Sequence, residues 1–207
     1  MTELMKHIAE RLTQRGFEVY LTGNQADTRT KLLSLIQPGQ SVGVGGSVSI
    51  RELDLGDALA AQNSPVHWHW LADTPQAGDA AKEQARTADV YLASANAVTA
   101  DGRIVNIDGT GNRVAATFQG PKTVILAVGA QKLVDGGLDA AIARVRRVAC
   151  PANARRLGLK TPCGLTGKCN PAACNNDVAM CRVITVLEHP SNGRRVIVLL
   201  SDDEIGY

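Results

Sequence analysis

The segment that most limits the fold of this chain is the run TVILAVGA at positions 123–130. It is continuous and apolar, as expected of a strand covered on both faces, and such strands belong to parallel sheets connected by helices. The sequence predicts that a helix over Leu138–Val145 follows it. We therefore predict an α/β fold built on a parallel central sheet.

Helices and short strands also alternate before this run. An apolar stripe of Leu4, Ile8 and Leu12 predicts a first helix that ends at Gly16, and FEVYL follows as a strand. The further expected elements are a helix through Leu32, Leu33 and Ile36, a strand at SVGVGG, a helix through Ile50, Leu53 and Leu59, a strand at VHWHW, a helix at QAGDAAKEQARTA and a strand at 89–93.

Three regions depart from this alternation. Residues 95–121 hold the β-prone pieces RIVNI and RVAATF, with hairpin turns at Asp101-Gly102 and Asp108-Gly109, and predict a β-rich insertion. Residues 150–181 contain three prolines and no hydrophobic period, which predicts an irregular cysteine-rich loop. CRVITVLEH and RRVIVLL predict a closing hairpin around residues 191–193.

Size, charge and composition exclude several classes of protein. A length of 207 residues predicts one domain over 1–207, since a domain averages roughly 150 residues. The formal net charge of +2 and an aromatic content of 3% disfavour nucleic-acid binding by a basic field or by base stacking. The N-terminus lacks the apolar core of a signal peptide, and no stretch reaches the roughly 18 apolar residues that cross a bilayer. We expect a soluble, cytoplasmic protein without a membrane span.

Four cysteines in the C-terminal loop form the sharpest chemical signal. Their spacing is Cys-x5-Cys-x4-Cys-x6-Cys, at Cys163, Cys169, Cys174 and Cys181. An aperiodic loop lets four thiolates converge on an iron–sulfur cluster or, alternatively, on zinc, and the eight basic residues over 144–182 would stabilise thiolates. Buried cysteines that pack as small hydrophobes are the other interpretation. We expect that role for the fifth cysteine, Cys150, which lies 13 positions before Cys163.

A second signal is VGVGGSVSI, where a strand runs into a glycine-rich turn and a helix. Backbone N–H groups at Gly45, Gly46 and Ser47 would face an anion there, although a tight turn alone also needs glycine. The polar block that follows the strand at 89–93 predicts a pocket at the carboxyl ends of the strands. Its members include Asn96, Asp101, Asn106, Asp108, Asn112 and Arg113. In that pocket Arg113 would bind a carboxylate and acids would transfer protons.

Histidines give a weaker signal. His67 and His69 alternate with two tryptophans, so they would share one strand face and could bind a metal ion. We favour a half-buried strand with its tryptophans facing inward.

The segments GVGGSVSIRELDL, SANAVTADGRIVNIDGTGNRVAA, TPC-x-x-TGKC and SDDEIGY together resemble the LUD-domain family, named for lactate utilisation. The resemblance covers nearly all of Val42–Tyr207. It implies a Rossmann-like three-layer fold, similar to ribose-phosphate isomerase and CoA-transferase domains. Taken together with the four-cysteine loop, the resemblance favours a 4Fe-4S cluster, with zinc as the alternative. Two departures are the gap between Cys169 and Cys174, which is commonly shorter in that branch, and Gln131, where the family usually has asparagine.

The resemblance also implies a set of pocket residues. They are Gly45, Gly46, Ser47, Glu52, Asn96, Asn106, Asp108, Asn112 and Arg113. Among them we assign catalytic roles to Glu52, Asp108 and Arg113, and ligand binding to the others.

Three functions follow from these observations. The first is a cluster-binding component of hydroxy-acid oxidation, which binds a small anionic molecule and works beside iron–sulfur partner proteins of a lactate-oxidising system. The second is an isomerase-like or CoA-transferase-like enzyme with a structural zinc, and the third is a non-enzymatic scaffold. Whether the chain is itself catalytic, and whether it forms a homo-oligomer, is left open by the sequence.

Overall fold

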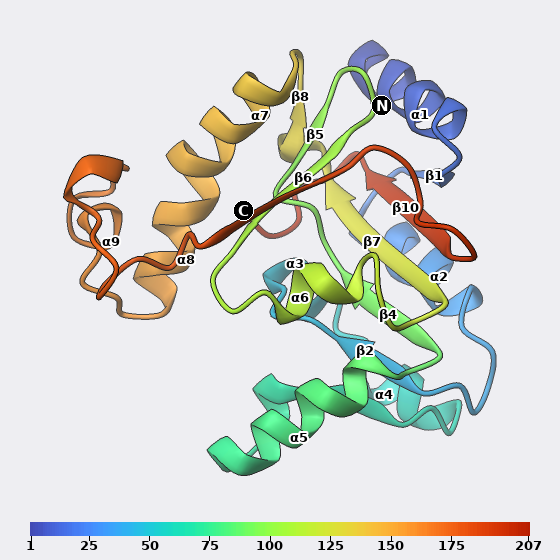
Figure 1. Cartoon of the computed structure of the whole chain (residues 1–207). Helices are drawn as coiled ribbons and strands as arrows, with labels where there is room; N and C mark the ends of the chain where they lie inside the picture. Colours follow the sequence, from blue (N-terminus) through green and yellow to red (C-terminus); the bar gives the residue numbers. More distant parts are fainter.

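The computed structural model describes residues 1–207 and has a six-stranded sheet at its centre (Figure 1). All its neighbouring strands pair in parallel, in the order β1-β10-β7-β4-β2-β3. These strands are β1 (Glu18–Thr22), β2 (Val42–Val44), β3 (Val66–Trp68), β4 (Val90–Ala93), β7 (Thr123–Gly129) and β10 (Arg195–Ser201). The apolar run that dominates the sequence is therefore β7, an inner strand, and the predicted α/β fold is confirmed.

Nine α-helices accompany the strands. They are α1 (Glu3–Gln14), α2 (Gln25–Ser34), α3 (Val48–Glu52), α4 (Gly56–Ala61), α5 (Pro75–Arg86), α6 (Asn112–Ala116), α7 (Leu138–Arg144), α8 (Cys150–Arg156) and α9 (Pro162–Thr166). None of them combines the length and apolar character that crossing a membrane requires.

Helices cover the central sheet on both faces, which gives a three-layer, Rossmann-like arrangement. On one face α1, α5 and α6 pack against alternate residues of β7, Val124, Leu126 and Val128. On the other face α2, α3 and α4 pack against Ile125 and Ala127. Because β7 buries side chains on both faces, its sequence is continuously apolar rather than alternating.

A second sheet takes two of its four strands, β5 and β6, from the predicted β-rich insertion at 95–121 and the other two from later in the chain. It has the order β8-β5-β6-β9. Its strands are β5 (Ala97–Thr99), β6 (Ile104–Asp108), β8 (Leu133–Val134) and β9 (Val183–Leu187). Beside it α7 continues through a π-helical turn, Val145–Ala149, into α8, and Figure 1 shows α7, α8 and α9 forming an arm to the side of the central sheet.

Four local expectations were wrong. RVAATF is not a strand but contains most of α6, which begins after Gly111 in the left-handed conformation, at φ 89°. β9 and β10 do not form a hairpin: β9 pairs with β6, and β10 lies between β1 and β7. The cysteine region is not wholly irregular, since it contains α8 and α9. His69 begins a 3-10 turn, so it does not share a strand face with His67.

Close packing of β2 against α5 gives a testable prediction. A Cβ atom at Gly43 would meet the carbonyl oxygen of Ala85 and lie 2.8 Å from the Ala85 Cα. Gly43→Ala should therefore lower the free energy of unfolding by about 1–3 kcal/mol, because backbone must shift. Gly56→Ala is the matched control, since nothing lies within 4 Å of its added Cβ. Urea unfolding curves measure both, and equal stabilities of the two variants would contradict the prediction.

Candidate functional site

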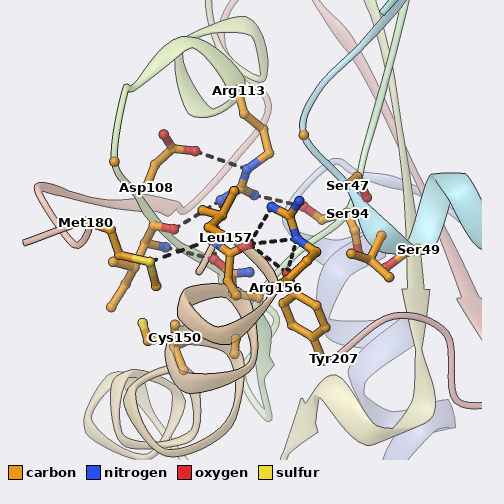
Figure 2. A pocket seen from close by; sticks show the side chains of 18 of the residues that line it. Ser47, Ser49, Ser94, Asp108, Arg113, Cys150, Arg156, Leu157, Met180 and Tyr207 are labelled. Carbon is orange, nitrogen blue, oxygen red and sulfur yellow. Dashed lines mark hydrogen bonds and ion pairs between the residues drawn. The ribbon is translucent and has the colours of Figure 1, made fainter. Parts of the chain in front are cut away.

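A cavity of about 300 Å³ lies where the carboxyl ends of β2, β4 and β7 meet the second sheet and α8 (Figure 2). Residues just beyond these strands line it: Gly46 follows β2, Ser94 follows β4 and Lys132 follows β7. The sequence predicted a polar pocket at this edge of the sheet, which is where ligands bind in open α/β folds.

The glycine-rich turn forms one wall of this cavity. Gly46 and Ser47 line it, and the Ser47 hydroxyl accepts a hydrogen bond from the Ile50 amide, which caps α3. Gly45 lies just outside the wall. A Cβ there would lie 2.8 Å from the Tyr91 hydroxyl oxygen and 2.9 Å from Arg113 Cγ, so glycine allows Arg113 to approach the strand.

Arg113 organises the polar block. Its Nε lies 3.0 Å from Asp108 Oδ2, and its side chain and that of Asp108 are only 11% and 10% exposed. The remaining N–H groups donate to Asn106 Oδ1, at 2.7 Å, to the Ile107 carbonyl, at 3.1 Å, and more weakly to two further oxygens. Every N–H of this guanidinium thus has an acceptor within the protein, so its first role is to hold the surrounding loops.

The predicted asparagines divide into two groups. Asn96 and Asn106 belong to the Arg113 network: Asn106 Oδ1 accepts from the Asn96 amide, and Asn96 Oδ1 accepts from the Ile107 amide. Asn106 is fully buried and does not line the cavity, whereas Asn96 does. Asn112 lines the cavity at the start of α6, and its side chain makes no hydrogen bond within the protein.

Glu52 lies away from the other predicted residues. It does not line the cavity, and its Oε2 accepts a 2.6 Å hydrogen bond from the amide of Gly206. The carboxylate therefore fixes the C-terminal segment across the end of α3.

Lys132 is a site residue that the sequence analysis missed. It is 2% exposed and lines the cavity, and its Nζ lies 2.6 Å from Ser49 Oγ and 3.0 Å from Ser94 Oγ. Burial, and then the charges of Arg144 and Arg113, lower the pKa of Lys132 to about 7, against a smaller opposing effect of Glu52. Its position just after the central apolar strand was the signal that could have identified it.

Arg156 stands at the mouth of the cavity, on α8. Its Nε and Nη2 donate to Asn153 Oδ1, and Nε also donates to the Tyr207 hydroxyl at 3.3 Å. The guanidinium lies 4.6 Å from the ring centre of Trp70, a cation–π contact. Its Nη1 makes no hydrogen bond within the protein, and Figure 2 shows the side chain directed into the cavity. Arg156 is therefore freer than Arg113 to bind an anion.

One helical face connects these groups. Val145, Ala149, Cys150, Asn153, Arg156 and Leu157 all line the cavity from the rod made by the π-helical turn and α8. Arg144, just before the turn, anchors the rod by donating to the carbonyls of Gln131, at 2.9 Å, and Asn96, at 2.7 Å.

The four cysteines predicted to bind a metal line a second cavity, of about 170 Å³, together with Arg146. All five cysteines of the chain are free thiols. No three Cys, His, Asp or Glu side chains converge closely enough to hold a single metal ion. Met180 and Cys181 line both this cavity and the larger one, so the two are neighbours.

Cys150 occupies a different environment from the other four cysteines. It is buried in an apolar cluster with Ala97 and Val105, as expected of a small hydrophobe, although its Sγ also lies 3.3 Å from that of Cys181. That contact, and then the charge of Arg146, lower the pKa of Cys181 to about 7 against the effect of burial. The pKa values of Cys169 and Cys174 are raised, first by burial and then by neighbouring thiols.

His69 lines the mouth of the larger cavity, whereas His67 does not. Burial is the main cause that lowers the pKa of His69, with smaller effects from Lys82 and Arg156. The two histidines are therefore not brought together as a metal site.

The fold and the site define a Rossmann-like α/β domain with a polar cavity beside a cavity of thiols. A family model for the LUD domain matches residues 5–200, and the chain therefore belongs to the LUD domain family, which is related to lactate utilisation proteins. No curated protein matches the sequence. The crystal structure of a DUF162 family protein from Deinococcus radiodurans is similar in fold, with a TM-score of 0.53 and 14% identity over 96% of each chain.

The two arginines should respond differently to substitution. Arg113→Met leaves the Asp108 carboxylate buried without its partner and should lower the free energy of unfolding by about 3–5 kcal/mol. Arg156→Met, at an exposed position, should change it by less than about 1 kcal/mol but weaken the binding of small carboxylates. Urea unfolding and thermal-shift titration with 2-hydroxy acids measure these effects. Comparable destabilisation by both variants would contradict this division.

The buried amine predicts a pH dependence of stability. The pKa of Lys132 is about 7 in the folded chain, against about 10.4 in an unfolded one. Between these values the unfolded chain binds one more proton, so the free energy of unfolding should rise with pH, by up to about 1.4 kcal/mol per unit. Urea unfolding at several pH values should show wild type gaining stability relative to Lys132→Met over this range. A constant difference between them would show that Lys132 titrates normally.

Proposed function

We propose that this LUD-domain protein binds a 4Fe-4S cluster through Cys163, Cys169, Cys174 and Cys181 and a small carboxylate in the neighbouring cavity, as a component of hydroxy-acid oxidation. The observation that carries the proposal is the shared wall: Met180 and Cys181 face both the thiol cavity and the cavity that contains Lys132. When bound, the cluster would supply one-electron transfer next to the ligand.

The donor set fits a cluster better than zinc. A zinc ion needs four ligands around one centre, with each sulfur about 2.3 Å away. In a four-iron cluster each thiolate binds a different iron, so the sulfurs surround a volume instead of a point. Four thiols that line a cavity of about 170 Å³ are closer to the second arrangement.

Positive charge supports the same assignment. Arg146 lines the thiol cavity. The contact with Cys150 is the main cause that lowers the pKa of Cys181, and the charge of Arg146 adds to it, which favours the thiolate needed for ligation. Arg146, Arg147 and Lys168 surround an adjoining hollow that includes Cys169. A cluster with four thiolates is anionic, and these cations would stabilise it.

The larger cavity suits a small carboxylate. Its volume of about 300 Å³ is at the lower end of the range for small-molecule sites. Arg156 at the mouth offers an unbonded N–H group, and Lys132 offers an amine at the base. A 2-hydroxy acid has a carboxylate and an adjacent hydroxyl group, which match these two donors.

The CoA-transferase-like or isomerase-like alternative depended on Glu52 acting beside the glycine-rich turn. Glu52 lies outside the cavity and holds the Gly206 amide. The geometry therefore favours the cluster-binding function over that alternative.

Metal analysis tests the proposal. Protein purified without oxygen should show visible absorbance and roughly four irons and four sulfides per chain. Serine at Cys163, Cys169, Cys174 or Cys181 should lower the iron content and destabilise the arm, because ligand binding contributes to folding. Cys150→Ser is the matched control and should keep the iron.

Two results would change this conclusion. Colourless protein with one zinc per chain would replace the cluster with a structural zinc site. Loss of iron in Cys150→Ser, with iron retained in Cys174→Ser, would move the ligand set to Cys150, Cys163, Cys169 and Cys181.

A further inference from the structure

Lys132 is a buried amine without an acidic partner. Its side chain is 2% exposed, and no carboxylate oxygen lies within 4.0 Å of its Nζ. Its hydrogen bonds go only to the hydroxyls of Ser49 and Ser94. Buried lysines are normally paired with acids, so this arrangement is unfavourable for a protonated amine.

The charges around Lys132 act in the same direction. The guanidinium groups of Arg144 and Arg113 disfavour a second positive charge, and only the smaller effect of Glu52 opposes them. Burial contributes most, and together these effects bring the pKa of the amine to about 7. A lysine that is desolvated and close to other cations is nucleophilic near neutral pH.

The C-terminal segment closes over this amine. A Cβ atom at Gly206 would collide with Ser49 Oγ and lie 2.9 Å from Lys132 Nζ, so only glycine lets the chain pack here. Gly206, at φ 69°, is held by Glu52 through its amide and by Gln131 Nε2 through its carbonyl. The segment therefore shields one side of the amine, while the cavity reaches it from another side.

We propose that Lys132 forms an imine with the carbonyl carbon of a 2-oxo acid whose carboxylate is held by Arg156. This inference deepens the proposed function, on which it rests, because a 2-oxo acid is the product of 2-hydroxy-acid oxidation. The amine nitrogen adds to the carbonyl carbon and forms the C–N bond. The carbonyl oxygen then leaves as water, taking up the two protons lost by nitrogen, and no electrons are exchanged with another molecule. The Ser49 and Ser94 hydroxyls, 2.6 and 3.0 Å from Nζ, are placed to relay these protons.

Reductive trapping tests the inference. The protein is incubated with pyruvate and cyanoborohydride, which reduces an imine to a stable amine, and the adduct is located by peptide mass spectrometry. We expect one adduct, at Lys132, among the seven lysines and the N-terminal amine. Mapping on the wild-type chain gives this answer even if a variant folds poorly.

Three variants and one probe sharpen the test. Lys132→Met should remove the adduct, while Lys122→Met, at an exposed lysine outside both cavities, should leave it unchanged. Arg156→Met should lower the adduct yield at limiting pyruvate by about 10- to 100-fold, as expected for loss of a charged hydrogen bond. Acetone, which has the carbonyl but no carboxylate, should be trapped as weakly by wild type as pyruvate is by Arg156→Met.

Adducts spread over exposed lysines, or a yield unchanged in Lys132→Met, would overturn the inference. Iron and sulfide are measured on the same preparations, so the two proposals fail separately. Cluster without trapping overturns only the role of Lys132. If the pyruvate adduct forms but no anaerobic preparation contains a cluster, the cluster proposal is overturned and the proposed imine at Lys132 still stands.

Discussion

The buried contact between Arg113 and Asp108 is the interaction on which the site depends. The two side chains meet at 3.0 Å with little exposure to solvent, and the guanidinium also contacts oxygens of Ser94, Asn96, Asn106 and Ile107. These groups come from the segment between β4 and β5 and from β6. A charged pair in such a place is stable only when its remaining donors and acceptors are satisfied, and here a single guanidinium joins both sheets at the edge where the ligand cavity opens.

Because every N–H of Arg113 already has an acceptor within the protein, the donor groups free to contact a small molecule in the cavity come from elsewhere. Lys132 lies at the base of the cavity and Arg156 at its mouth, and they reach it from different parts of the chain. Arg113 and Arg144 still affect the ligand site through their charge, since both oppose protonation of Lys132. Burial is the largest cause of the lowered pKa of Lys132, and the two structural arginines add to it through their charge.

The sequence predicted the elements that a local pattern determines, but not the contacts between segments that are distant in the chain. The apolar run of β7 predicted the central sheet because burial on both faces leaves a continuous signature. The pairing of β9 with β6 could not be read locally, because the turn residues near Asn192 suit a hairpin as well as the longer connection to β10 that the structure has. Lys132 escaped notice for a similar reason: its significance comes from Ser49, 83 positions away, and Ser94, 38 positions away. The cysteine spacing, in contrast, predicted that the four thiols converge on a metal centre; the structure places them around one cavity, and the metal centre itself stays a prediction.

The rod formed by α7, the π-helical turn and α8 contributes residues to both cavities. The extra residue of a π-helical turn rotates the helix that follows it relative to a regular α-helix. After this turn Cys150, Asn153 and Arg156, each three positions apart, face the ligand cavity. The same rod leads into the cysteine segment, and Asn153 Nδ2 lies 3.7 Å from the sulfur of Met180 in the shared wall. This contact joins α8, which carries Arg156, to the segment that lines the thiol cavity.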